Sequence, residues 1–279
     1  MTNTIVGVYD RLALSRPWVT LFLVFIIVAG FATQLPKIKL DASADSLLLQ
    51  GDPSLEFYRE SSRQYSSEEF LLITWQPHVA MLAPESLGPL RKMADELRLL
   101  EGVSSVVTIL DVPLLESPPV SLSDITSGDE LPSLSQPLMD PTLALQELTS
   151  SPIYAELLAS RDGKLSAVQI NLQRDERYND LLYQRESMRK QDAAGELDTA
   201  QREELGRIEQ AFKVHAGAAL EKQGYLVASV RVIAARYTDY ADVFVGGVPM
   251  IAADMVSFVQ SDLVLFGGAI LGIMLVVLA

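Results

Sequence analysis

The chain contains no cysteine and only two histidines, His78 and His215, among its 279 residues. Without cysteine it can form neither a disulfide bond nor a thiolate metal site, and two histidines are too few for a histidine-rich metal centre. No partner motif for acid–base or nucleophilic chemistry accompanies His215, so we interpret it as a packing or surface residue. We therefore expect neither a metal ion nor another cofactor.

The motifs of enzyme active sites are also lacking. The sequence has no nucleophile elbow, no glycine-rich phosphate loop after a strand and no spacing typical of metal ligands. Its two Gly-Gly pairs, Gly246-Gly247 and Gly267-Gly268, lack the context of a phosphate-binding loop. The sequence therefore predicts a protein that is not an enzyme.

Positive charge is scarce. Lysine and arginine number 22 against 36 aspartate and glutamate residues, which gives a formal net charge of −14. An acidic chain does not favour nucleic acid as a partner. The excess of acidic residues is typical of a domain that must stay soluble in water.

Two apolar segments carry no charge at all, and residues 17–35 are the first of them. This segment is long enough to span a bilayer, and Trp18 lies near one end, where interfacial aromatic residues belong. We predict that it forms transmembrane helix 1, preceded by a cytoplasmic amphipathic segment at 1–16. The alternative is a cleaved signal peptide with Gly30-Phe31-Ala32 at the cleavage site.

The second uncharged segment ends a longer region in which a strand leads directly to a helix. The β-type run Val243–Val245 is followed by Gly246, Gly247 and Pro249, and proline is typical of a helix start. A helix from Pro249 to the last residue would be roughly 46 Å long at ~1.5 Å per residue, whereas a hydrocarbon core is about 30 Å thick. We therefore expect transmembrane helix 2 at 259–279, with the preceding turns in water or protein.

Four residues of this region are candidates for function. Asp254 and Asp262 lie near the expected membrane surface, where they could bind a cation or sense protons, although such acids more often meet only interfacial water. Gly268 and Gly272 are four residues apart in the apolar helix and could form a helix-packing face. Neither apolar segment contains an ionisable residue at its centre, so no proton relay is expected here.

Residues 36–258, between the apolar segments, are predicted to form a water-exposed domain. A Pro-rich insertion at 111–150, expected to have little regular structure, separates strand-like and helix-like stretches. The expected elements are strands at Phe70–Trp75, Val103–Leu110, Leu165–Leu172 and 242–246, and helices at Pro84–Leu100 and within 176–237. This order predicts a split βαβ, or ferredoxin-like, α+β domain whose four-stranded sheet carries its helices on one face.

The helical excursion at 176–237 has one weak point, Asp192–Gly195. Asp198 and Gln201 follow with the spacing of a capping box, which indicates that a second helix begins there. The charges between 184 and 210 are interpreted as a solvated helical face or an antiparallel helical pair.

Four stretches of the sequence together resemble the resistance–nodulation–division (RND) superfamily, in its predicted-exporter or MMPL-like branch, which includes hopanoid exporters. They are DASADSLLLQGDPSLEFY (41–58), ILDVPLLESPPVSL (109–122), LMDPTLALQELTSSPIYAELLASRDGKLSAVQINL (138–172) and VRVIAARYTDYADVFVGGVPMIAADMVSFVQSDL (230–263). They cover much of the chain in the order expected of such a protein, and the last stretch is the most specific.

The resemblance implies a multi-pass protein of the bacterial inner membrane with a large periplasmic porter domain. It would belong to an exporter that uses the proton-motive force to move lipid-like or hydrophobic substrates. The partners implied are membrane lipids, such a substrate, the remaining transmembrane half of the transporter and further copies in a homo-oligomer. Family members have more spans, a second porter domain and an acidic relay, so we interpret this chain as an N-terminal fragment.

By the same resemblance, Gly246, Gly247 and Pro249 would form the joint between the porter domain and the membrane. Asp254 to Asp262 would be the segment that enters the lipid. Glycine suits a moving joint because it adopts backbone angles that other residues avoid.

A two-span receptor with an extracytoplasmic ligand-binding domain is the alternative function. It predicts the same succession of span, domain and span, and would differ in a cytoplasmic signalling segment. A secreted soluble domain would need cleavage after Ala32 and does not explain the apolar stretch Leu263–Ala279. Arg11 and Arg16 precede the first span and Lys37 and Lys39 follow it, so local charge does not decide the orientation.

Overall fold

The computed structural model divides the chain into two compact units, Met1–Asp41 and Ala42–Ala279. Its described residues are 17–32, 54, 57, 61, 69–117, 131–134 and 140–278. In the first unit these residues form one helix, α2, Pro17–Ala32. The amphipathic segment predicted at 1–16 and the last residues of the expected first span lie outside the described residues.

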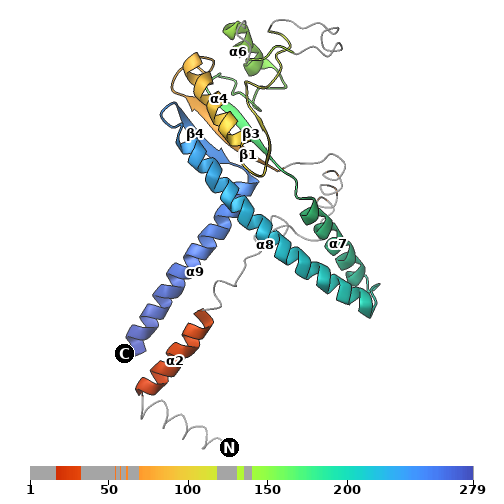
Figure 1. Ribbon diagram of the computed structural model, residues 1–279, viewed down its shortest axis with the longest axis vertical. Helices are drawn as coiled ribbons and strands as arrows, with labels where there is room; N and C mark the ends of the chain where they lie inside the picture. The colour runs from red at the N-terminus through yellow and green to blue at the C-terminus, as the bar shows by residue number, and fades with distance from the viewer. Residues whose placement is uncertain are drawn as a thin grey trace, which may run out of the picture. The chain divides into compact units, whose positions relative to one another are not determined.

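The second unit is built on one antiparallel sheet of four strands, in the order β2-β3-β1-β4 (Figure 1). The strands are β1 Phe70–Pro77, β2 Val103–Val107, β3 Ser166–Leu172 and β4 Ala241–Gly246. β1 pairs with both β3 and β4, so it lies inside the sheet. The expected mixed α+β architecture with four strands is therefore confirmed.

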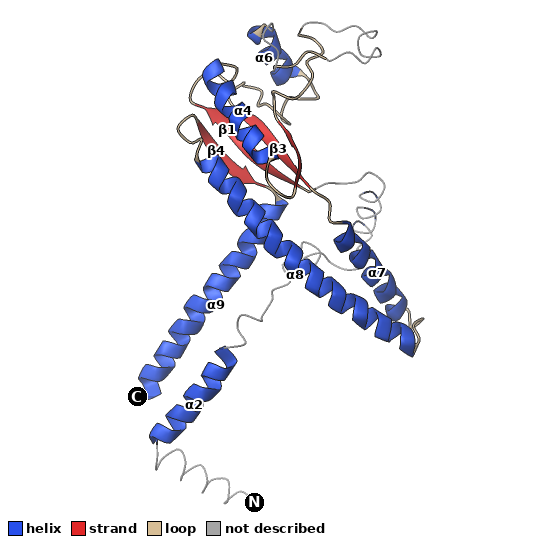
Figure 2. Cartoon of the chain, viewed as in Figure 1, coloured by secondary structure: helices blue, strands red, loops and turns tan. Residues whose placement is uncertain are grey.

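One face of this sheet is buried beneath helices. Leu71, Ile73 and Trp75 of β1 are fully buried, whereas the residues between them are only partly so. α4, Pro84–Arg98, and the C-terminal part of α8, Thr199–Ala235, lie over this face (Figure 2). Each large apolar side chain removed from water contributes ~1.5–3 kcal/mol, so this layer holds the domain together.

The second strand is shorter than predicted, because it ends at Val107 rather than at Leu110. The carboxylate of Asp111 accepts hydrogen bonds from the Thr108 backbone N–H, at 2.9 Å, and from the Thr108 hydroxyl, at 2.7 Å. These bonds hold residues 108–111 in a tight turn instead of extending the sheet.

The Pro-rich insertion also differs from the prediction, because part of it is a helix, α6, Pro141–Ser150. Pro141 occupies the first turn, where its missing N–H costs nothing, and the side chain of Asp140 caps the Thr142 N–H at 2.9 Å. The buried carboxylate of Glu147 accepts the backbone N–H groups of Leu115 and Glu116 at 2.6 and 3.0 Å. These bonds dock the start of the insertion against α6.

The helical excursion folds back on itself, which is one of the two interpretations of its charges given above. α7, Glu176–Ala193, ends at a turn in which Gly195 has φ +74°, and α8 follows. The capping box is present, since Asp198 accepts the Gln201 N–H and the Gln201 side chain accepts the Asp198 N–H, both at 2.8 Å. α7 and α8 pack as a pair around a small apolar cluster that contains Leu181 and Phe212.

The last helix, α9, spans Val248–Leu278, 31 residues. Of the described part of the chain, it is the one helix long and apolar enough to cross a membrane, over Val248–Val277. The expected first span is not shown as a second such helix. With 16 residues, α2 would be ~24 Å long, against a hydrocarbon core of about 30 Å.

Candidate functional site: the joint between the sheet and α9

A single residue, Gly247, separates the edge strand β4 from α9. β4 is hydrogen-bonded to β1 up to the pair Leu72 and Gly246. The Ile251 N–H then donates to the Gly247 carbonyl at 3.1 Å, which closes the first turn of the helix. Pro249 is the second residue of α9, where its missing N–H needs no partner. The sheet therefore passes directly into the candidate membrane helix.

Gly247 is required at this joint for two steric reasons. Its φ is +123°, a backbone conformation that side chains with a Cβ rarely adopt. A Cβ atom there would lie 2.8 Å from the carbonyl oxygen of Phe70 and 3.2 Å from the Cα of Leu71. A Cβ on Gly246 would meet its nearest atom, the Leu72 carbonyl oxygen, at 4.0 Å, which is ordinary contact. Of the two glycines of the predicted joint, Gly247 therefore has no room for a Cβ atom, whereas Gly246 has.

The first turns of α9 are fastened to the domain. Met250 and Ala253 pack against the main hydrophobic core. The Arg231 guanidinium on α8 donates two hydrogen bonds to the Asp254 carboxylate, with N···O distances of 2.8 and 2.7 Å. This pairing holds the pKa of Arg231 above its ordinary value. A bidentate pair of this kind fixes direction as well as distance.

Asp254 therefore does not merely sit in interfacial water, the more usual environment weighed from the sequence. Its partner, Arg231, was not identified from the sequence, because the two residues are 23 positions apart on different helices. The signal present in the sequence was an arginine in the last turns of the helix before the strand and an acid in the first turns of the helix after it. Only the turn of the chain through β4 brings them together.

The other residues predicted for this region lie farther along α9. Asp262, Gly268 and Gly272 are exposed, and a Cβ on either glycine would meet no atom within 4 Å. They are not part of the joint. The role of Gly268 and Gly272 in helix packing stays a prediction.

The C-terminal end of α8 is fastened to α4. The Tyr237 hydroxyl donates to the Glu96 carboxylate at 2.9 Å. The other Glu96 oxygen lies beside the Arg236 guanidinium, in an ion pair that lacks hydrogen-bond geometry. Burial, together with the bond to Glu96, raises the pKa of Tyr237 to about 12. α8, whose Arg231 binds Asp254, is thus itself fastened to α4 at its C-terminal end.

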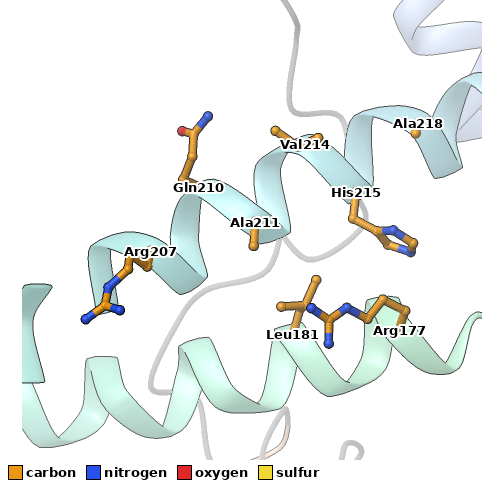
Figure 3. A pocket seen from close by; sticks show the side chains of 8 residues that line it. All are labelled: Arg177, Leu181, Arg207, Gln210, Ala211, Val214, His215 and Ala218. Atoms are coloured by element: carbon orange, nitrogen blue, oxygen red, sulfur yellow. The ribbon is translucent and has the colours of Figure 1, made fainter. Parts of the chain in front are cut away.

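A second feature, a groove of about 550 Å³, lies between α7 and α8 (Figure 3). His215 borders it, and its Nε2 lies 2.8 Å from the carboxylate of Asp175, the N-cap of α7. Burial raises the pKa of Asp175, but the Tyr178 N–H and His215 outweigh it, so the pKa lies below its ordinary value. His215 therefore lies in a polar contact between the two helices, with a partner, Asp175, that the sequence did not identify.

Among the described residues, no three His, Asp or Glu side chains are grouped so that they could hold a metal ion. No family model, curated protein or solved structure matches the chain.

Proposed function

We propose that this chain supplies the first porter domain of a proton-driven, RND-type exporter of lipid-like or hydrophobic molecules. The observation that carries the proposal is the direct passage of β4 through Gly247 into α9, braced by the Arg231–Asp254 pair. Without a flexible linker, a tilt or rotation of the membrane helix must move the sheet. A receptor that signals through this helix would need the same coupling, and the resemblance of the sequence motifs favours the exporter over it.

The sheet topology agrees with this proposal. The strand order β2-β3-β1-β4 places β3 between β1 and β2, and β1 between β3 and β4. Two βαβ units are then interleaved, which is the arrangement of a ferredoxin-like domain. We assign that fold to the porter domain.

In this proposal the protein lies in the bacterial inner membrane, with residues 17–35 as the first span. Both chain ends are cytoplasmic, and the domain between the spans is periplasmic. The acidic composition suits a water-exposed domain. Membrane lipids, a hydrophobic substrate and further transmembrane segments of the same transporter are its partners.

Deleting the gene from its source bacterium tests the function. We expect the deletion strain to retain a hydrophobic fluorescent dye several-fold longer than the parent, and to accumulate lipid-like material in the inner membrane. A protonophore should abolish the difference, because the transport step would lose its driving force. An unchanged dye efflux and lipid distribution would rule out the exporter, and a ligand-dependent signal in its place would support the receptor.

The joint is tested by two matched variants of the full-length gene product. Asp254→Asn removes the charge that pairs with Arg231 and should reduce efflux several-fold. Asp239→Asn makes the same change at an exposed position outside the joint and should leave efflux near the parent level. Exchanging the partners, Arg231→Asp with Asp254→Arg, should restore part of the loss. Equal loss in both Asn variants, or no rescue by the exchange, would contradict coupling through this pair.

A further inference from the structure

We propose that the groove between α7 and α8 binds a small amphiphile with one anionic head and a short apolar tail. The groove belongs to the helical hairpin and not to the joint, so the inference stands apart from the exporter proposal. Its volume of about 550 Å³ lies within the range of ~300–1,000 Å³ that small-molecule sites occupy.

The floor of the groove is apolar. Leu181 on α7 is only 3% exposed and lies under the groove, and Val214 on α8 leaves 59% of its surface in water. Ala211 and Ala218 complete the α8 side. Their side chains are too small to fill the space between the helices, and a short alkyl chain placed there would cover Val214.

One arginine without an acidic partner borders this floor. Figure 3 shows the Arg177 side chain running from α7 to lie beside Leu181. In the part of the chain that the structure describes, no acidic side chain pairs with Arg177. Arg207 lies at the other end of the groove, where its guanidinium points away from Arg177 and contacts Glu204 at 2.9 Å. Arg177 is therefore the arginine that a ligand on this floor would meet.

The chemistry of the head group follows from the Arg177 side chain. A guanidinium matches a carboxylate or a phosphate with two parallel N–H···O bonds. His215 does not compete for the head, because its Nε2 is already bonded to Asp175. Its contact instead holds the N-terminus of α7 against α8 beside the groove.

The test uses the full chain in nanodiscs of a zwitterionic lipid and ligand-observed NMR. Three probes separate the two parts of the ligand: hexyl phosphate carries both, inorganic phosphate has only the head, and hexanol has only the tail. We expect hexyl phosphate to bind with a Kd on the order of 1 mM, and each single-part probe to bind at least tenfold more weakly. Empty nanodiscs give the background from partition into lipid. Equal binding of phosphate, equal binding of hexanol, or no binding above the empty discs would each overturn the proposal.

Variants place the site on the hairpin. Arg177→Gln should weaken hexyl phosphate at least tenfold, since it removes the charge-assisted bonds. Arg207→Gln, at the other end of the groove, should bind as the parent does. Lys213→Gln makes the same kind of change at an exposed position of α8 outside the groove, and should bind as the parent does. Ala218→Trp fills the groove without altering charge and should abolish binding. It tests the site independently of the arginine variants, should those unfold the hairpin. Unchanged binding in the Trp variant would overturn the assignment to this groove.

Discussion

At the scale of the residue, two neighbouring glycines at the joint have different roles. The sequence treats Gly246 and Gly247 alike, as a pair suited to a moving joint. The structure distinguishes them, because only Gly247 has a positive φ and lies against the backbone of β1. Because Gly247 lies against the backbone of β1, it fixes where α9 starts relative to the sheet, whether or not the joint also moves.

Gly247→Ala should destabilise the domain by roughly 2–4 kcal/mol, from backbone strain and the clash with Phe70. Gly246→Ala is the matched control and should cost less than about 1 kcal/mol, since its Cβ would meet nothing closer than 4.0 Å. Fluorescence of the buried Trp75 during denaturant unfolding measures the difference, in a Trp18→Phe background that removes the chain's other tryptophan. Similar losses in the free energy of unfolding for the two variants would contradict a steric requirement for glycine at position 247.

Tyr237 offers a test of the contact between α8 and α4. Its pKa is raised to about 12, by burial and by the bond to Glu96, against an ordinary tyrosine value near 10. The contact therefore stabilises the fold fully below the ordinary pKa, and this contribution is lost as the pH rises toward 12. An ultraviolet titration of the parent minus Tyr237→Phe should show one phenol ionising near that value. Ionisation of this phenol near pH 10 would contradict the buried contact.

At the scale of the element, helix boundaries follow local rules. Asp198 and Gln201 satisfy each other's exposed backbone N–H groups, and Gly195 supplies the positive φ of the turn before them. α6 follows the same rules with Asp140 and Pro141, although a proline count alone made its region look irregular. Proline in a first turn is a start signal, and it is a break only further inside a helix.

Asp198→Ala should loosen the first turn of α8 by about 1 kcal/mol, the typical cost of losing a cap. Amide hydrogen exchange in residues 199–204 should then accelerate about fivefold. Glu203→Ala is the matched control, because it removes an exposed acid from the same turn without removing the cap. Equal acceleration in both variants would mean that charge, and not the capping bond, holds the turn.

At the scale of the whole molecule, the absence of cysteine is an experimental advantage. Any cysteine that is introduced is the only one in the chain. Lys222 is exposed on α8, so a cysteine there should react without disturbing the fold. Its accessibility from either side of the membrane reports the orientation of the domain.

If the domain is periplasmic, Lys222→Cys should react with a membrane-impermeant maleimide in spheroplasts as fully as after lysis. The parent chain, without cysteine, should remain unlabelled under both conditions. Labelling that appears only after lysis would place the domain in the cytoplasm and contradict the proposed topology.

The sequence alone determined the features that depend on near neighbours. The alternating residues of Leu165–Leu172 predicted β3, with Val168 and Ile170 on the buried face. The break at Asp192–Gly195 and the cap after it predicted that α7 ends and α8 begins there. Gly, Pro and an apolar run predicted that a strand passes directly into a long helix. Each of these follows from local backbone preference and side-chain period.

Only the tertiary structure decided which distant groups meet. Glu96 and Tyr237 are 141 residues apart, and Glu147 reaches back 32 residues to the Leu115 N–H. Arg231 and Asp254 meet because β4 lies between them and reverses the chain. No local preference encodes such pairs, since the distance between two side chains across elements is set by how the sheet and its helices pack. Through that packing Asp254, which the sequence suggests is solvated, pairs with Arg231 and braces the joint.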